Sequence, residues 1–272
     1  MKPVSHTRFK EPPHLVLLHG DSEMKQSFLL AGVCFCLFNS SLQAALVYNQ
    51  NFEGMTPAQN AVPNDLSNDG WLVGANVFNS GGGFVYNYFA FPSPNGGPAF
   101  AGVVAGEGGA GQGTNQLSIY NDYNNADHRN GSNNRIEANV FRDVGVLTAS
   151  DVGLEYTFSF DAKQGNIGGS TTATAFVKVI KTSDASFAEL AIDSTDTTAV
   201  GSLWSTDQVK VTIDAAWVGE TLQIGFTNTA SNDEGSGVFY DNIAVGTAVP
   251  EPGSASLLAV GSILAFFRRK RS

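Results

Sequence analysis

The alternation of aromatic and polar residues over residues 154–163 constrains the fold of this chain more than any other feature. Three aromatic residues should lie on one side of an extended backbone and four polar residues on the other, namely Tyr156, Phe158 and Phe160 against Glu155, Thr157, Ser159 and Asp161. Successive side chains of a strand point to opposite faces, so this pattern predicts a half-buried β-strand.

Further strands are predicted along the chain, with turn residues between them. They cover residues 46–53, 71–78, a short stretch around 85–89, 116–123, 136–141, 172–181, 208–214, 221–228 and 238–245. No segment of residues 45–252 carries a helical period of useful length. The sequence therefore predicts an all-β ectodomain over residues 45–248, folded as an antiparallel β-sandwich.

Two segments of the ectodomain are predicted to be connections. Residues 193–202 are rich in Ser, Thr and Asp and are expected to form a linker. Residues 102–113 are rich in glycine, lack the Lys-Ser/Thr pair of a phosphate-binding loop and precede no predicted helix. We therefore expect a tightly turning loop there and no phosphate site.

Residues 24–44 have the organisation of a secretory signal peptide. Lys25 supplies the positive charge, residues 27–38 form the apolar run, and Ala44 marks a small-residue exit. The run is too short to span a bilayer of about 30 Å, so export through the Sec translocon and cleavage near Ala44 are expected. Residues 1–23 are interpreted as a wrongly assigned upstream start; the alternative is a genuine, longer n-region.

The last 24 residues, 249–272, combine three parts in a fixed order. A Pro-Glu-Pro motif comes first and consists of Pro250, Glu251 and Pro252. An apolar run over residues 253–267 follows, and a basic cluster ends the chain with Arg268, Arg269, Lys270 and Arg271. The apolar run predicts a short transmembrane helix, and the basic cluster would hold its end in the cytoplasm.

This tripartite end resembles the PEP-CTERM sorting signal of Gram-negative bacteria that produce exopolysaccharide. The resemblance implies that an exosortase-type enzyme processes the tail. The protein would then be anchored only transiently in the inner membrane and would pass to the cell surface or extracellular matrix. The alternative is an ordinary C-terminal anchor.

Charge and cysteine content exclude several classes of function. Residues 45–252 hold 22 Asp and Glu against 7 Lys and Arg, so the ectodomain would repel the phosphates of nucleic acids. The two cysteines, Cys34 and Cys36, both lie in the predicted signal peptide. After its cleavage the ectodomain has no disulfide, zinc thiolate site or cysteine nucleophile.

Three segments of the ectodomain resemble the jelly-roll carbohydrate-binding modules. They are Asn51-Phe52-Glu53, the segment 153–163, and Phe239-Tyr240-Asp241-Asn242-Ile243. The resemblance implies a jelly-roll sandwich in which Glu53 and Asp241 converge on a structural Ca²⁺ ion, with backbone carbonyls completing the six to eight oxygens that calcium requires. The alternative is that both carboxylates merely cap turns at strand ends.

No catalytic constellation is recognisable in the ectodomain. His128 is its only histidine and lies among loop residues, without a Gly-x-Ser-x-Gly elbow. No pair of carboxylates stands out as the acid and base of a glycosidase. We therefore expect a protein that is not an enzyme.

Aromatic side chains in loops are the candidates for sugar binding, because their faces can stack on pyranose C–H groups. Tyr120 and Tyr123, beside the Asn- and Asp-rich loop, are the predicted ligand-binding residues. The sequence thus predicts an exported surface or matrix protein that binds glycan, with extracellular polysaccharide as its partner. The alternatives are a polysaccharide hydrolase or lyase, and a structural, adhesin-like protein without a small ligand.

Overall fold

The computed structural model describes residues 47–59, 61, 63–92, 101–121, 134–184, 186–230 and 234–247. The chain divides into two compact units, Met1–Gln43 and Ala44–Ser272, and every described residue belongs to the second. The predicted upstream extension, signal peptide and sorting signal lie outside the described residues. The described part of the chain contains no helix with the length and apolar character that crossing a membrane requires.

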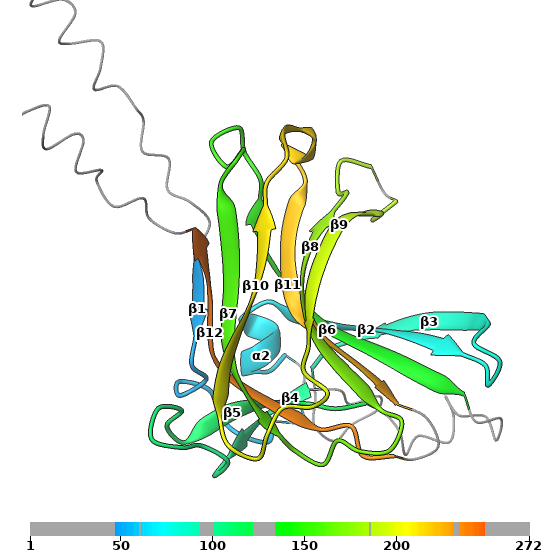
Figure 1. Cartoon of the computed structure of the whole chain (residues 1–272), viewed down its shortest axis with the longest axis vertical. Coiled ribbons are helices and arrows are strands. Elements are labelled where there is room, and N and C mark those ends of the chain that lie inside the picture. Colours follow the sequence, from blue (N-terminus) through cyan, green and yellow to red (C-terminus); the bar gives the residue numbers. More distant parts are fainter. Residues whose placement is uncertain are drawn as a thin grey trace, which may run out of the picture. The chain divides into compact units, whose positions relative to one another are not determined.

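Two antiparallel sheets of six strands each make up the described fold (Figure 1). Sheet A consists of β1 (Tyr48–Gln50), β4 (Ala101–Ala105), β5 (Asn115–Ile119), β7 (Glu155–Gln164), β10 (Ser205–Thr212) and β12 (Val238–Thr247). Its order is β10-β7-β12-β5-β4, and β1 pairs with β12.

Sheet B has the strand order β3-β2-β6-β11-β8-β9. Its strands are β2 (Trp71–Phe78), β3 (Phe84–Ala90), β6 (Arg135–Val146), β8 (Thr172–Ile180), β9 (Glu189–Asp196) and β11 (Thr221–Ala230). The described helices are short: α2 (Asp65–Asn68) and the 3₁₀ turn η1 (Ala215–Trp217). The predicted β-sandwich is confirmed.

Aromatic rings from both sheets fill the space between them. Tyr156, Phe158 and Phe160 of β7 are fully buried, which confirms the face predicted from their alternation. The ring of Phe226 in β11 lies 5.5 Å from that of Phe158 and 5.4 Å from that of Phe160. It also stacks on Tyr240 of β12, with 3.7 Å between ring centroids.

Two strands occur where connections were predicted. β4 lies within the glycine-rich segment, where its small residues pair with β5 and its Val103 carbonyl accepts a hydrogen bond from the N–H of Ala58. β9 overlaps the predicted Ser/Thr/Asp linker. It is an edge strand whose side chains are mostly exposed, so it lacks the alternation that marks a half-buried strand.

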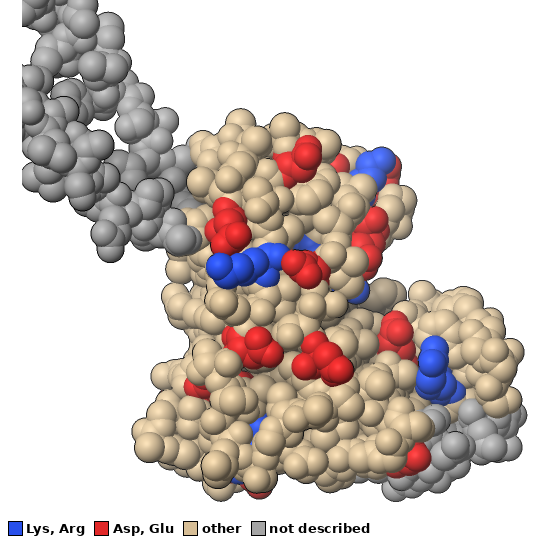
Figure 2. Space-filling model, in the orientation of Figure 1, with Lys and Arg blue, Asp and Glu red and all other residues tan. Residues whose placement is uncertain are grey.

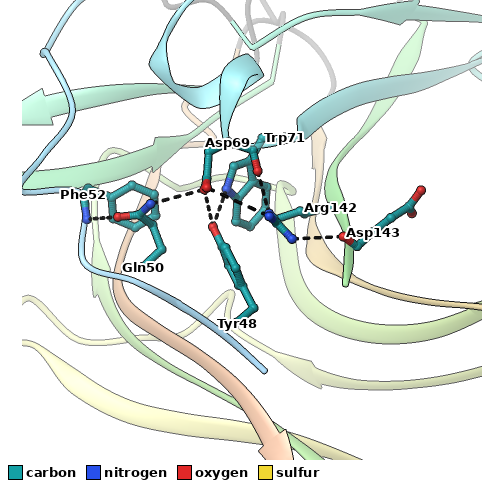
Figure 3. A network of polar contacts seen from close by, with 7 residues as sticks. All are labelled: Tyr48, Gln50, Phe52, Asp69, Trp71, Arg142 and Asp143. Atoms are coloured by element: carbon teal, nitrogen blue, oxygen red, sulfur yellow. Dashed lines mark hydrogen bonds and ion pairs between the residues drawn. The ribbon is translucent and has the colours of Figure 1, made fainter. Parts of the chain in front are cut away.

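A polar network fixes the short strand β1 of sheet A against sheet B (Figure 3). The Tyr48 hydroxyl accepts a hydrogen bond from Trp71 Nε1 at 3.0 Å and donates to the carboxylate of Asp69. The guanidinium of Arg142 lies 3.9 Å from the centre of the Tyr48 ring, and its Nε donates to the Asp69 carbonyl at 2.7 Å. Burial raises the pKa of Tyr48 well above its usual range, so the hydroxyl remains a donor.

The chain turns sharply just after β1, which is why the strand ends before the predicted residue 53. Gln50 Oε1 accepts a hydrogen bond from the N–H of Phe52 at 2.8 Å, and its Nε2 donates to Asp69 at 3.2 Å (Figure 3). Phe52 adopts a φ of 59°, in the left-handed region that non-glycine residues rarely occupy. Its side chain is fully buried, so core packing holds this conformation and sets the direction in which Glu53 leaves the strand.

We predict that Tyr48→Phe lowers the free energy of unfolding by roughly 1–3 kcal/mol, because it removes a buried donor and acceptor while keeping the ring beneath Arg142. Urea denaturation of the chain followed by circular dichroism measures the change. A loss below about 0.5 kcal/mol, the usual scatter of surface substitutions, would contradict the role given to this hydroxyl.

Candidate functional site

The structure brings both predicted metal ligands, Glu53 and Asp241, into one cluster together with Asp161. Asp241 and Asp161 are directly paired across β12 and β7. The charges of Asp161 and Glu53 both act on Asp241. We call these three residues the carboxylate cluster. Since Phe160 and Tyr240, the residues before the two aspartates, point into the core, the aspartates lie on the outer face of sheet A.

Asp241 is completely buried, and its two carboxylate oxygens have different surroundings. Oδ1 accepts a hydrogen bond from the N–H of Asn242 at 2.6 Å. Oδ2 is buried without a hydrogen-bond partner. The pairing of β12 with β7 is irregular between Asp241 and Ala244, where Asn242 adopts a φ of 47°. This irregularity is a β-bulge of the kind that redirects a side chain at a site.

The environment of Asp241 disfavours its charged form. Burial is the main cause that raises the pKa of Asp241 to about 7. The N–H of Asn242 and the side chain of Gln116 oppose the rise, whereas the negative charges of Asp161 and Glu53 add to it. A buried carboxylate that is short of one partner and faces two other carboxylates is unstable as an anion unless a cation joins it.

Glu53 links the turn after β1 to the start of β5. Its Oε1 accepts hydrogen bonds from the N–H groups of Thr114 and Asn115, both at 2.7 Å. Gly113 has a φ of 59°, and a Cβ at this position would lie 2.6 Å from Glu53 Oε1. The glycine therefore allows the loop before β5 to close over the glutamate.

Asp161 was not selected from the sequence, yet it lies at the centre of the hydrogen bonds around the cluster. It accepts from Gln112 Nε2 at 2.8 Å, from Asn242 Nδ2 at 2.8 Å and from Thr206 Oγ1 at 2.6 Å. Burial acts to raise the pKa of Asp161, but these three hydrogen bonds outweigh it and hold that pKa below its usual value. The sequence signal was available, because Asp161 occupies a polar-face position of the strongest predicted strand.

The three carboxylates alone do not enclose a cation. In the described residues, no group of three or more His, Cys, Asp or Glu side chains is arranged as a metal site. The donor set nevertheless suits a hard cation, since it offers carboxylate oxygens and the unpartnered Oδ2 of Asp241. Backbone carbonyls would have to supply the remaining ligands.

A groove of about 260 Å³ crosses the outer face of sheet B. In Figure 1, β2 and β3 extend to the right while β8 and β9 rise from the same sheet, so sheet B is strongly bent. The groove is lined by four phenylalanines and four amides, namely Phe89, Phe141, Phe176 and Phe187 with Asn76, Asn87, Asn139 and Gln223. We call it the outer groove.

Glycines under two of these rings shape the outer groove. A Cβ on Gly74 would come within 3.1 Å of the Phe89 ring, and one on Gly225 within 2.6 Å of the Phe176 ring. The rings therefore lie low over the strands β2 and β11. Phe89 and Phe187 remain 76% and 68% exposed, so their faces are available to a ligand.

The two charged residues that line the outer groove compensate each other. The charged residues that line it are Lys178 and Glu189, which form an ion pair at 3.2 Å. The ammonium of Lys178 also lies 4.3 Å from the centre of the Phe176 ring. Acidic side chains are scattered over the face of the molecule seen in Figure 2. Two further carboxylates border the groove: Glu137 accepts hydrogen bonds from Asn76 at 3.0 Å and from Asn139 at 3.4 Å, and Asp143 accepts one from Gln223 at 3.0 Å.

A second cleft, of about 360 Å³, runs along β1 and β12 and is lined by Asn49, Gln50, Asn51, Asn242, Ile243 and Ala244. It has no aromatic lining residue. Its position beside Asn242 connects it to the carboxylate cluster and not to the outer groove.

Of the two tyrosines predicted to bind ligand, Tyr120 is described and is not part of the outer groove. Tyr120 is half-buried just after β5 and does not line the groove. Tyr123 and His128 lie outside the described residues. The groove residues come from β2, β3, β6, β8, β11 and the start of β9, and sequence reasoning missed them because only the sheet order brings these elements together.

Comparison with known proteins gives only distant structural similarity. No family model matches the chain. No curated protein matches it either. A cyclase from Fischerella sp. TAU is 16% identical with a TM-score of 0.44, over 73% of this chain and 93% of the cyclase. The CBM22-1 xylan-binding domain of Paenibacillus barcinonensis Xyn10C is 13% identical with a TM-score of 0.38, over 75% of this chain and 96% of that domain.

Tailspike protein 4 of bacteriophage CBA120 is also similar, at 12% identity and a TM-score of 0.38. The match covers 54% of this chain, and this chain spans only 18% of the tailspike domain. All three similarities are too distant to assign a function to this chain. The function must be argued from its own residues.

Proposed function

We propose that this protein is an exported, non-enzymatic glycan-binding protein that holds a neutral sugar chain in the outer groove. One observation carries the proposal. Among the described residues, four phenylalanines and four amide side chains line a groove whose two charged lining residues form an ion pair.

The chemistry of these residues suits a neutral sugar. Exposed rings such as Phe89 and Phe187 offer flat apolar faces to the C–H groups of a pyranose ring. An amide side chain both donates and accepts hydrogen bonds, as a sugar hydroxyl does. Asn76 and Gln223 each donate one hydrogen bond to a neighbouring carboxylate, of Glu137 and Asp143 respectively, and each also carries an amide oxygen and a second N–H. The acidic ectodomain would repel polyanionic chains, which favours neutral ones.

A polysaccharide-acting enzyme is the less favoured function. Asp241 has the raised pKa that suits a general acid, but its side chain is completely buried and cannot reach a sugar. The carboxylate nearest the groove, Glu189, is paired with Lys178.

We further propose that Glu53 and Asp241 hold a structural Ca²⁺ ion. The unpartnered, buried Oδ2 of Asp241 supports this, because an ionised carboxylate in that position needs a cation. Bound calcium would offset the mutual repulsion of the carboxylate cluster. Glu53 would join the turn after β1 to the site, and Asp161 would orient Asn242 beside it.

The finer assignments rest on the sequence. Chain segments β6 to β8 and β10 to β12 alternate between the two sheets, which supports the jelly-roll connectivity. Export by the Sec translocon, processing by an exosortase-type enzyme and a final place at the cell surface or in the matrix are proposed from residues 24–44 and 249–272.

We predict that Phe187→Ala and Phe89→Ala each weaken binding to a neutral glycan about tenfold or more, because each removes an exposed stacking face. A glycan array identifies the ligand, and isothermal titration measures the affinities. Leu203→Ala is the control, since Leu203 is equally exposed but lies outside the groove. Unchanged affinity in both phenylalanine variants would exclude the groove, and release of shortened sugars would favour the enzyme.

We predict opposite effects of Asp241→Asn with and without calcium. In EGTA at pH 8 the variant should be more stable than the wild type by roughly 2–4 kcal/mol, because ionising a group whose pKa is about 7 when folded, against 3.8 for an ordinary aspartate, costs stability. This difference should shrink as the pH falls from 7 towards 4, where the wild-type carboxyl is protonated.

Calcium should raise the melting temperature of the wild type and leave that of Asp241→Asn unchanged. Asp207→Asn, which changes a half-buried aspartate on β10 outside the carboxylate cluster, is the matched control and should keep the response to calcium. A wild-type melting temperature that is the same in calcium and in EGTA would exclude the metal site.

We predict that Glu251→Ala prevents maturation of the C-terminus, because it removes the only charged side chain of the Pro-Glu-Pro motif. Mass spectrometry of the protein from an exosortase-containing host should show the tail retained in the variant and removed from the wild type. Equal mature masses would favour an ordinary anchor.

A further inference from the structure

The two sheets expose their edges very differently. β9 and β10 lie at edges that carry Glu189, Asp193, Asp207 and Lys210, and Thr195 Oγ1 of β9 contacts Asp207 of β10 at 3.3 Å. β4 is covered by the segment that contains Ala58. β3 lies at the other edge of sheet B, and among the described strands only β2 pairs with it.

The β3 edge has few of the features that usually prevent strands from pairing between molecules: its pairing with β2 is irregular only at the Phe84 end, where Val85 has no partner on β2, and is regular from Tyr86 to Ala90. No charged residue occurs between Asp69 and Glu107, so β3 and its flanks are uncharged. Its large apolar side chains are exposed, with Phe84 at 59% and Val85 at 48%. Natural proteins blunt such edges with charges, prolines or bulges, because an open edge offers main-chain donors and acceptors to another strand.

The sequence of β3 is nearly symmetric about Asn87. Tyr86 and Tyr88 flank it, and Val85 and Phe89 come next on either side. If two antiparallel copies pair about a two-fold axis at Asn87, Tyr86 faces Tyr88 of the second copy, Val85 faces Phe89, and Asn87 faces Asn87. Cross-strand pairs of aromatic, β-branched and amide residues of this kind stabilise a sheet.

Charge also selects a second copy of this chain as the occupant of the edge. Because the ectodomain is strongly acidic, two copies repel each other wherever their carboxylates approach. The β3 edge is a surface on which they can meet without bringing carboxylates together. We propose that the protein forms a two-fold symmetric homodimer through antiparallel pairing of β3 with β3 of a second copy, joining the two copies of sheet B into one sheet.

This geometry has a consequence for ligand binding. A two-fold axis perpendicular to the joined sheet leaves both outer grooves on the same face. If the proposed glycan binding holds, the dimer is bivalent, and one long sugar chain can occupy both grooves with an avidity that a single groove lacks. The dimer itself does not depend on that function.

Position-specific cross-linking tests the register of the dimer. The full chain, with Cys34→Ser and Cys36→Ser, carries either Asn87→Cys or Phe84→Cys and is oxidised before a non-reducing gel. On the proposed axis the Asn87 Cα atoms lie about 4.5–5.5 Å apart, within disulfide range, whereas the Phe84 positions are about 20 Å apart. Asn87→Cys should give at least tenfold more cross-linked dimer; equal cross-linking at both positions, or none at either, overturns the proposal.

Sedimentation velocity of the full chain gives an independent measurement. The wild type should sediment with twice the mass of Val85→Lys, because a lysine opposite Phe89 disrupts the pairing while a solvent-exposed position tolerates it in the monomer. A circular dichroism spectrum that matches that of the wild type confirms that the variant folds; its melting temperature should be lower, because dimer formation stabilises the native state. A monomeric wild type that binds glycan overturns the dimer alone, and a dimer that binds no glycan overturns only the proposed function.

Discussion

The packing of Phe226 against rings from both sheets is the contact on which the rest of the molecule depends. Its ring is fully buried and meets Phe158, Phe160 and Tyr240 of sheet A, while Trp71 of its own sheet stacks 6.3 Å away. Each buried aromatic side chain contributes roughly 1.5–3 kcal/mol through the apolar surface that it removes from water. Without a cysteine in the described residues, this apolar contact takes the place that disulfides occupy in many exported domains.

The alternation of side chains that places aromatic rings in the core also places aspartates on the outer face of sheet A. Phe160 and Tyr240 point inward, so Asp161 and Asp241, the next residues on β7 and β12, must point outward and meet across the strand pair. The strand register that buries the aromatic rings therefore also brings these two aspartates together. A shift of one residue in the pairing of β12 would expose the rings and break the cluster together.

The strands that are buried on one face could be predicted from the sequence, because apolar and polar residues alternate along them. Strands buried on one face, such as β7, β11 and β12, alternate clearly and were predicted close to their observed positions. β4 and β9 were missed because one is built from small residues and the other is exposed on both faces.

The candidate sites show the limit of local patterns. Glu53 and Asp241 were selected through a family resemblance; the negative charge of Glu53 acts on Asp241 in the structure, and their role as calcium ligands stays a prediction. Asp161 occupies a polar-face position of the strongest predicted strand, but its proximity to Asp241 depends on the order of strands in the sheets, as does the proximity of the groove rings to one another. Tyr123, the signal peptide and the sorting signal lie outside the described residues, so those predictions stand as predictions.

The pairing of β1 with β12 decides how this domain responds to force. Tyr48, at the start of β1, pairs with Val245, near the end of β12, so both ends of the domain leave it side by side. Tension between the two ends would open this pair from its tip, one hydrogen bond at a time. The first resistance would come from the Tyr48 contacts with Asp69, Trp71 and Arg142. These contacts would have to break before β1 could separate from β12.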